Sequence, residues 1–115
     1  MNIEEYREYC LSKGAVTEAT PFDEKTLVFK VNGKMFALTN MESFAYVNLK
    51  CNPEYAIELR EEHEGVKPGF HMNKQHWNSV STDDSIPEEL FKELIDQSYE
   101  LVAKGHRKKV RESLK

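Results

Sequence analysis

The sequence has no long hydrophobic run and no excess of positive charge. Its longest apolar runs, residues 35–38 and 44–47, are four residues long, whereas a helix that spans a bilayer needs about 20. Sixteen Lys and Arg against 20 Asp and Glu give a net charge of −4 at pH 7. These absences argue against a membrane-spanning helix and a globally basic nucleic-acid-binding protein, although a local basic patch remains compatible with the composition.

Cysteine is scarce, because Cys10 and Cys51 are the only two in the chain. They are far apart and neither belongs to a CxxC motif, so they do not indicate a redox pair or a zinc site. Cys10 shares a predicted helix face with Ile3, Tyr6 and Leu11, which favours a buried structural thiol over a nucleophile. Since the N-terminal residues are charged and amphipathic, with no apolar signal segment, we expect a cytoplasmic protein.

Motifs of common enzyme and cofactor sites are also missing. There is no GxSxG turn for a nucleophilic serine and no GxGxxG or GxxxxGK loop for phosphates. His63, His71 and His76 lie near acidic residues, but HxxxxH without a further spaced ligand is a weak metal motif. We therefore expect a non-enzymatic protein with no cofactor and no metal site.

With 115 residues, 39% of them hydrophobic, the chain fits a single domain of residues 1–115. Apolar spacing and cap residues predict elements in the order α-β-β-β-α-β-β-α, and residues 15–25 as a connection with room for a short strand. Because hairpins connect the strands, we expect an α+β, two-layer domain with an antiparallel sheet and helices packed on one side. The helices begin near Asn2, Asn52-Pro53 and 85–88, and the strands are 26–31, 34–39, 44–49, 66–70 and 77–81.

The clearest local pattern is a β-hairpin around Asn32-Gly33, a dipeptide that favours a two-residue type I′ turn. In a regular hairpin, this turn pairs Lys30 with Met35 and Phe29 with Phe36 across the two strands. Apolar residues on both faces of the pair predict strands that are covered on both sides.

Residues 67–77, KPGFHMNKQHW, concentrate polar and aromatic side chains, and two interpretations remain open. In the first, Lys74 contacts phosphate, Asn73 and Gln75 bind base edges or backbone, and Trp77 stacks on a base. In the second, Trp77 belongs to the core and the histidines bind loop backbone, since one firm positive charge makes a poor phosphate site. Strand alternation predicts a mostly buried Trp77.

Several segments in order along the chain share one family pattern: 21–22 (PF), 27–31 (LVFKV), 33–37 (GKMFA), 47–50 (VNLK), 68–78 (PGFHMNKQHWN), 94–102 and 108–111. Together they resemble the MmcQ/YjbR family of small bacterial proteins. The resemblance implies a two-layer α+β fold of CyaY-like or secretion-chaperone-like shape. It also implies DNA binding through a double-wing arrangement of hairpins. Gln75 and Phe70 depart from the family pattern, which commonly has Arg and Tyr there, and His106-Arg107 replaces a more usual Leu-Pro.

The C-terminal segment is basic, because residues 104–115 hold six Lys and Arg against Glu112, whereas residues 1–103 carry a net charge of −9. Such asymmetry is typical of a nucleic-acid contact, and also of a cationic helix end followed by a frayed tail. With the resemblance, it leads us to expect DNA binding through the hairpin tip, the 67–77 loop and this tail. The candidate residues are Lys30, Lys34, His71, Asn73, Lys74, His76, Arg107, Lys108, Lys109 and Arg111.

The alternative function is a protein-interaction module that uses its sheet face or the 67–77 loop, as a secretion-chaperone-like shape would allow. An acidic main body favours a protein partner, because it repels nucleic acid. Salt-dependent affinity for DNA discriminates between the two functions.

Overall fold

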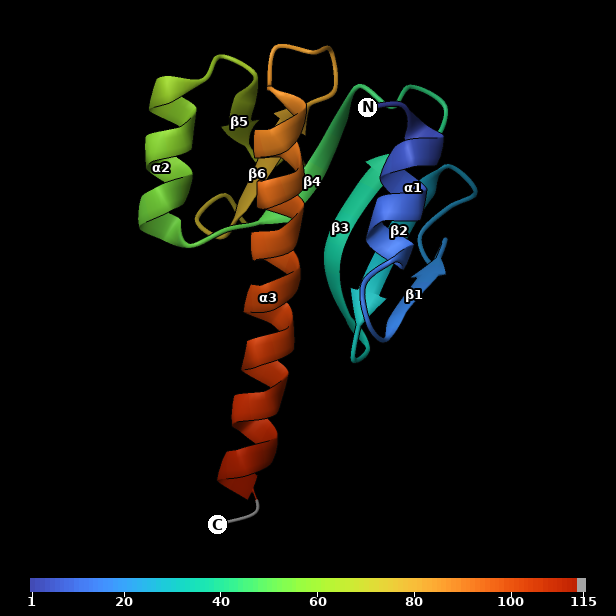
Figure 1. Cartoon of the computed structure of the whole chain (residues 1–115), viewed down its shortest axis with the longest axis vertical. Coiled ribbons are helices and arrows are strands. Elements are labelled where there is room, and N and C mark those ends of the chain that lie inside the picture. The colour runs from blue at the N-terminus through green and yellow to red at the C-terminus, as the bar shows by residue number, and fades with distance from the viewer. Residues whose placement is uncertain (114–115) are drawn as a thin grey trace.

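The computed structural model describes the backbone of residues 1–113 and the side chains of residues 1–104. Over these residues the fold is α+β, and its strands form one antiparallel sheet in the order β1-β2-β3-β4-β6-β5 (Figure 1). The expected fold class is confirmed. The elements are α1 (Ile3–Leu11), β1 (Val16–Ala19), β2 (Thr26–Val31), β3 (Lys34–Asn40), β4 (Tyr46–Lys50), α2 (Pro53–Glu62), β5 (Val66–Pro68), β6 (Trp77–Ser81) and α3 (Glu88–Ser113).

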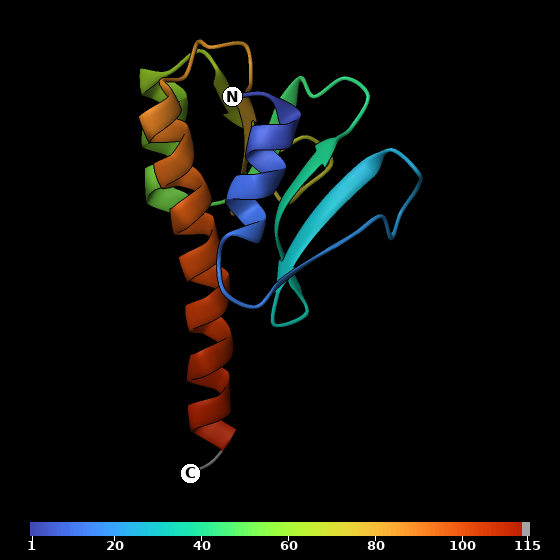
Figure 2. The ribbon, with the colours of Figure 1, turned by 45° about the vertical axis from the view of Figure 1, so that its right-hand side comes forward.

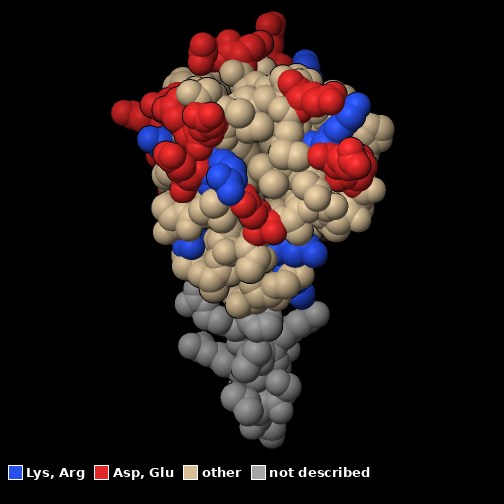
Figure 3. Space-filling model, turned by 90° about the vertical axis from the view of Figure 1, so that its right-hand side faces the viewer, with Lys and Arg blue, Asp and Glu red and all other residues tan. Residues whose placement is uncertain are grey.

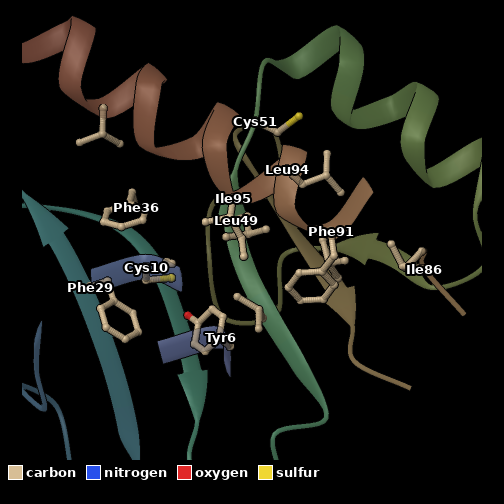
Figure 4. Close-up of a cluster of buried hydrophobic side chains, with 14 of the residues drawn as sticks. Tyr6, Cys10, Phe29, Phe36, Leu49, Cys51, Ile86, Phe91, Leu94 and Ile95 are labelled. Carbon is tan, nitrogen blue, oxygen red and sulfur yellow. The ribbon is translucent and has the colours of Figure 1, made fainter. Parts of the chain in front are cut away.

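The helices pack on one face of the sheet, which makes the fold two-layered (Figures 1 and 2). Tyr6 of α1, Phe29 of β2 and Ile95 of α3 are fully buried in one hydrophobic core between the layers (Figure 4). The α1 and α3 helices also bind each other, because Tyr9 Oη donates to Asp96 Oδ1 at 2.7 Å. In the described part of the chain, the opposite face of the sheet carries no helix, and the loop of residues 69–76 lies over part of it.

The first two helices begin at the cap residues that the sequence predicts. In α1, Glu5 N donates to Asn2 Oδ1 at 2.8 Å and Asn2 N donates to Glu5 Oε1 at 3.2 Å, which completes a capping box. In α2, Asn52 Oδ1 accepts from the backbone N–H of Glu54 at 3.0 Å, and Pro53 is the first helical residue.

The predicted element order lacks one strand, because β1 forms within residues 15–25. Val16–Ala19 pairs antiparallel with β2, and Glu18 accepts hydrogen bonds from Arg7 of α1. Four residues with little apolar character give a weak local pattern, and the edge of β2 supplies the missing stabilisation. The observed order is therefore α-β-β-β-β-α-β-β-α.

The β2–β3 hairpin has the predicted turn but not the predicted register. Asn32 and Gly33 both have positive φ, 53° and 78°, as a type I′ turn requires. Lys30 pairs with Met35 as expected, whereas Phe29 pairs with Ala37, so the predicted pair of Phe29 with Phe36 is wrong. Phe36 is the extra residue of a β-bulge. The bulge places both Phe36 and Ala37 in the core under the helices.

Gly33→Val should destabilise the protein by at least about 1 kcal/mol, because valine is strained at the positive φ of residue 33. A new Cβ meets no atom within 4 Å, so the loss is conformational rather than steric. Urea denaturation measures it, and Gly33→Asn is the matched control, since asparagine tolerates this conformation with a smaller loss. Equal midpoints for the wild type and Gly33→Val would contradict the turn assignment.

The α3 backbone continues to Ser113. The basic segment 104–115, predicted as a tail, is therefore helical as far as residue 113 (Figure 1). The side chains of Arg107, Lys108, Lys109 and Arg111 lie outside the described residues. Within the described part of the chain, no helix has the length and hydrophobicity needed to cross a membrane.

Candidate functional site

One face of the sheet carries no helices, and we call it the helix-free face. It is formed by every second residue of the strands. Val28, Leu38 and Trp77 anchor it, because they form a small hydrophobic cluster separate from the main core. The pairing of the strands and the alternation of side chains along each strand identify the other residues of this face. They are Thr17, Ala19, Thr26, Lys30, Met35, Asn40, Tyr46, Asn48, Lys50, Lys67, Ser79 and Ser81.

Charge is segregated between the sheet and the rest of the fold. The six strands contain four lysines, and their one carboxylate is Glu18. Glu18 pairs with Phe29 on the helix side, where it accepts hydrogen bonds from Arg7. Alternation places Lys30, Lys50 and Lys67 on the helix-free face, which therefore has no strand carboxylate despite the net charge of −4.

Charge also varies along the length of the molecule, as the view from the side on which β1 lies in Figure 1 shows. Figure 3 shows Asp and Glu gathered over the upper part of this view. The lowest charged side chains of the described body are basic, next to the end from which α3 projects. The predicted hairpin-tip residue Lys34 is exposed at the start of β3, and the turn between β2 and β3 lies toward this end (Figure 1).

The loop of residues 69–76 folds over the helix-free face and is fixed there by two polar strand residues. Phe70 N donates to Ser79 Oγ at 2.9 Å, and Asn48 Nδ2 donates to Phe70 O at 3.1 Å. Ser79 Oγ in turn donates to Asn48 Oδ1. Because Asn48 and Ser79 are buried, this closed set of bonds satisfies their polar atoms and holds the backbone of Phe70 in place.

Arg60 of α2 holds the other end of the loop. The helical pattern of residues 53–62 predicts a water-facing Arg60, and the structure shows this to be wrong. Its Nε donates to Asn78 Oδ1 at 2.7 Å, and its Nη2 donates to the carbonyl oxygens of Lys74 and Trp77. The guanidinium thus joins the helix layer, β6 and the loop through three of its five N–H donors.

The predicted site residues of the loop have different surroundings. Lys74 is exposed, and its Nζ donates to Gly69 O at 2.8 Å, which leaves further N–H donors on the ammonium group. Asn73 Oδ1 accepts from the backbone N–H groups of Gln75 and His76, so this oxygen shapes the loop. His71 and His76 are exposed, and Lys30 is half-buried beside Met35.

Trp77 is 8% exposed and packs against Val28 and Leu38, with Met35 and Met72 around it. The predicted burial is confirmed, so Trp77 belongs to the fold rather than to a stacking surface. The same contacts bring the β2–β3 hairpin and the 69–76 loop together on the helix-free face.

A pocket of about 450 Å³ opens between the loop and the segment that precedes β2. The rings of Phe70 and Tyr46 lie 4.9 Å apart at its edge. Phe22 and Phe70 remain 65% and 45% exposed, although both are large apolar side chains. The lining residues are Phe22, Thr26, Met35, Leu38, Thr39, Asn40, Tyr46, Asn48, Phe70, His71 and Met72.

The cysteines are buried away from this face. Burial raises the pKa of the Cys10 thiol to about 12 and that of Cys51 to about 11, which suppresses the thiolate. Over the described residues, no group of three or more His, Cys, Asp or Glu is placed to hold a metal ion.

Residues 11–101 match the sequence model of the YjbR family. Uncharacterized protein YjbR of Escherichia coli K12 is 37% identical over 101 residues, which are 87% of this chain and 86% of the relative. Uncharacterized protein YbdF of Escherichia coli O157:H7 is 38% identical over 86 residues, 74% of this chain and 70% of the relative.

Solved structures share the fold. The crystal structure of Deinococcus radiodurans protein DR2400 superposes with a TM-score of 0.86 at 39% identity, over 90% of this chain and 79% of that one. A crystal structure from Pseudomonas syringae has a TM-score of 0.77 at 26% identity, over 89% and 99% of the two chains. By sequence and by fold, the chain belongs to the YjbR family.

Proposed function

We propose that this protein binds DNA without catalysing a reaction, through the helix-free face, the hairpin tip and the basic C-terminal segment. The observation that carries the proposal is the segregation of charge, with lysines on a sheet face that has no strand carboxylate. Contacts between lysine side chains and phosphate groups supply most of the sequence-independent affinity for DNA. Lys30, Lys34, Lys67 and Lys74 are the described candidates for these contacts.

The arrangement of the hairpins also supports the proposal. The double-wing description of the family implies two hairpins that act together, and β2–β3 and β5–β6 are the candidates here. Met35 of the first and Met72 of the second pack around Trp77, so the two hairpins share one surface.

Binding should weaken steeply with salt, because each phosphate contact contributes about −0.9 to the slope of log affinity against log salt. Replacing Lys108, Lys109 and Arg111 together by Gln should weaken binding to all DNA sequences and flatten this slope by nearly 3. Fluorescence anisotropy with labelled DNA from about 50 mM salt upward measures both quantities. Lys92→Gln, on the helix side of the fold, is the matched control and should leave the slope unchanged.

The strand lysines are tested in the same titration. Lys30→Gln combined with Lys67→Gln should flatten the slope by nearly 2 if both bind phosphate. An unchanged slope would remove the helix-free face from the proposal. Absence of binding to both duplex and single-stranded DNA at about 50 mM salt would contradict DNA binding altogether.

The second candidate function is protein interaction, which the exposed rings of Phe22 and Phe70 beside an apolar pocket favour. Crosslinking followed by purification from lysate, with and without nuclease, distinguishes the two functions. Partners that survive nuclease treatment favour the protein-interaction module, and partners lost on treatment favour DNA binding.

A further inference from the structure

The pocket on the helix-free face has the size and the lining of a site for a flat, apolar group. Its volume of about 450 Å³ falls within the range of about 300–1,000 Å³ that is typical of ligand pockets. Phe22, Tyr46 and Phe70 contribute rings, and Met35 and Met72 contribute flexible thioethers. Thioethers adapt their shape to what they contact, so the lining suits planar occupants of slightly different size.

Thr39, Asn40 and Asn48 of the lining are bound within the fold, whereas the lining also includes the Tyr46 hydroxyl and the His71 imidazole. Thr39 Oγ1 donates to Tyr46 O at 2.7 Å, and Asn40 Oδ1 accepts from the N–H groups of Glu42 and Ser43. Asn48 is bound to Ser79 and Phe70, as described above. The pocket therefore offers mainly ring faces, with the Tyr46 hydroxyl and the His71 imidazole as its remaining hydrogen-bonding groups.

The strand surface beside the pocket carries positive charge. Lys30 pairs with Met35 of the lining on the same sheet face. Glu42 lies 3.3 Å from Lys25 Nζ, and Asp23 keeps its charge while it accepts from the N–H groups of Lys25 and Thr26. Glu64 and Asp83 lie on the other side of Tyr46 and Phe70, in a neighbouring hollow that Lys67 also lines. An apolar pocket beside a lysine-bearing, carboxylate-free strand surface is complementary to an unpaired nucleobase attached to a phosphate backbone.

We infer that this pocket receives an unpaired nucleobase, and that the nucleic acid bound by this face is single-stranded. The inference rests on the proposed function and specifies its ligand. In a duplex the faces of the bases are covered by their stacked neighbours, so they reach an aromatic pocket only at the energetic expense of unstacking. Every base has such a face, and stacking on rings therefore tolerates different sequences.

The test compares three labelled probes of equal length in fluorescence anisotropy at about 50 mM salt: oligothymidine, a duplex, and a single strand of abasic sites. We expect oligothymidine to bind at least about tenfold more tightly than the other two, because it alone offers unpaired bases. Phe22→Ala and Phe70→Ala should each weaken oligothymidine binding at least about fivefold and leave duplex binding unchanged. Ile57→Ala is the matched control, since Ile57 is an exposed apolar residue of α2 in the helix layer.

Trp77 supplies a second measurement, because it is the one tryptophan of the chain and packs against Met35 and Met72 of the lining. Its emission should shift with oligothymidine and stay constant with the abasic strand. Phe22 is largely exposed, so Phe22→Ala should keep the wild-type melting temperature, whereas Phe70→Ala loses the ring contact with Tyr46 and should remain folded with a slightly lower one.

Equal affinity for oligothymidine and duplex would overturn the inference and leave the proposed DNA binding in place. Folded Phe22→Ala and Phe70→Ala variants that bind oligothymidine as the wild type does would overturn it in the same way. Failure of all three probes to bind would instead contradict the proposed function itself.

Discussion

Gly69→Ala should unfold at a clearly lower urea concentration than the wild type, with a loss of about 2–3 kcal/mol in the free energy of unfolding. A Cβ at residue 69 would lie 2.8 Å from Trp77 Cβ and 2.9 Å from Trp77 O, well inside the usual separation of about 3.5–4 Å between carbon atoms. Neither atom belongs to a flexible side-chain end. Relief therefore requires the loop to move away from β6, where Gly69 N donates to Trp77 O at 2.9 Å.

Gly14→Ala is the matched control for this prediction. A Cβ at residue 14 would meet Tyr99 Oη at 3.5 Å, an ordinary contact, so its effect should stay within about 0.5 kcal/mol. Urea titration followed by Trp77 fluorescence compares the two variants. Equal midpoints would show that residues 69 and 77 are not packed this closely.

The parts of the fold that the sequence predicts well depend on residues that are close in the chain. The caps at Asn2 and Asn52 and the turn at Asn32-Gly33 need contacts within three residues, and all are present. Local hydrogen bonding and backbone preference suffice to specify such features.

The parts that were missed depend on distant partners. β1 has a weak pattern of its own and forms because β2 offers a free edge. The bulge at Phe36 departs from simple alternation, which would have turned either Phe36 or Ala37 away from the helices. With the bulge, both side chains are buried under the helix layer. A two-residue alternation of apolar residues cannot reveal such a bulge, because it assigns neighbouring residues to opposite faces of the sheet.

The candidate site also has one part that the local sequence predicts and one part that depends on distant residues. Strand alternation is enough to predict that Trp77 is buried, and the 67–77 segment was identified as unusual from its composition. Two of its anchors lie far away in the chain, because Asn48 is 22 residues from Phe70 and Arg60 is 14 residues from Lys74. One signal was available: Asn48 is an amide inside an otherwise apolar strand, and a buried amide needs partners.

Arg60→Ala should destabilise the protein by about 2–3 kcal/mol, because it removes charge-assisted hydrogen bonds to partly buried acceptors. Asn78, which is 2% exposed, would keep its bond to Ala56 O and lose the donor to its Oδ1. The carbonyl oxygen of Lys74 would lose its bond to α2, so the 69–76 loop should open more often. Limited digestion with trypsin, which cuts after Lys74, measures that opening separately from the urea midpoint.

Two further variants separate the geometry of Arg60 from its charge. Arg60→Lys keeps the charge but has a compact ammonium in place of the planar fork, so it should recover only part of the lost stability. Glu58→Ala, at an exposed position of the same helix, should change stability by less than about 0.5 kcal/mol. Full recovery in Arg60→Lys would show that charge alone is required. Unchanged stability and unchanged cleavage after Lys74 in Arg60→Ala would show that α2 does not hold the loop, and that the bonds of Asn48 and Ser79 to Phe70 are sufficient to fix it over the sheet.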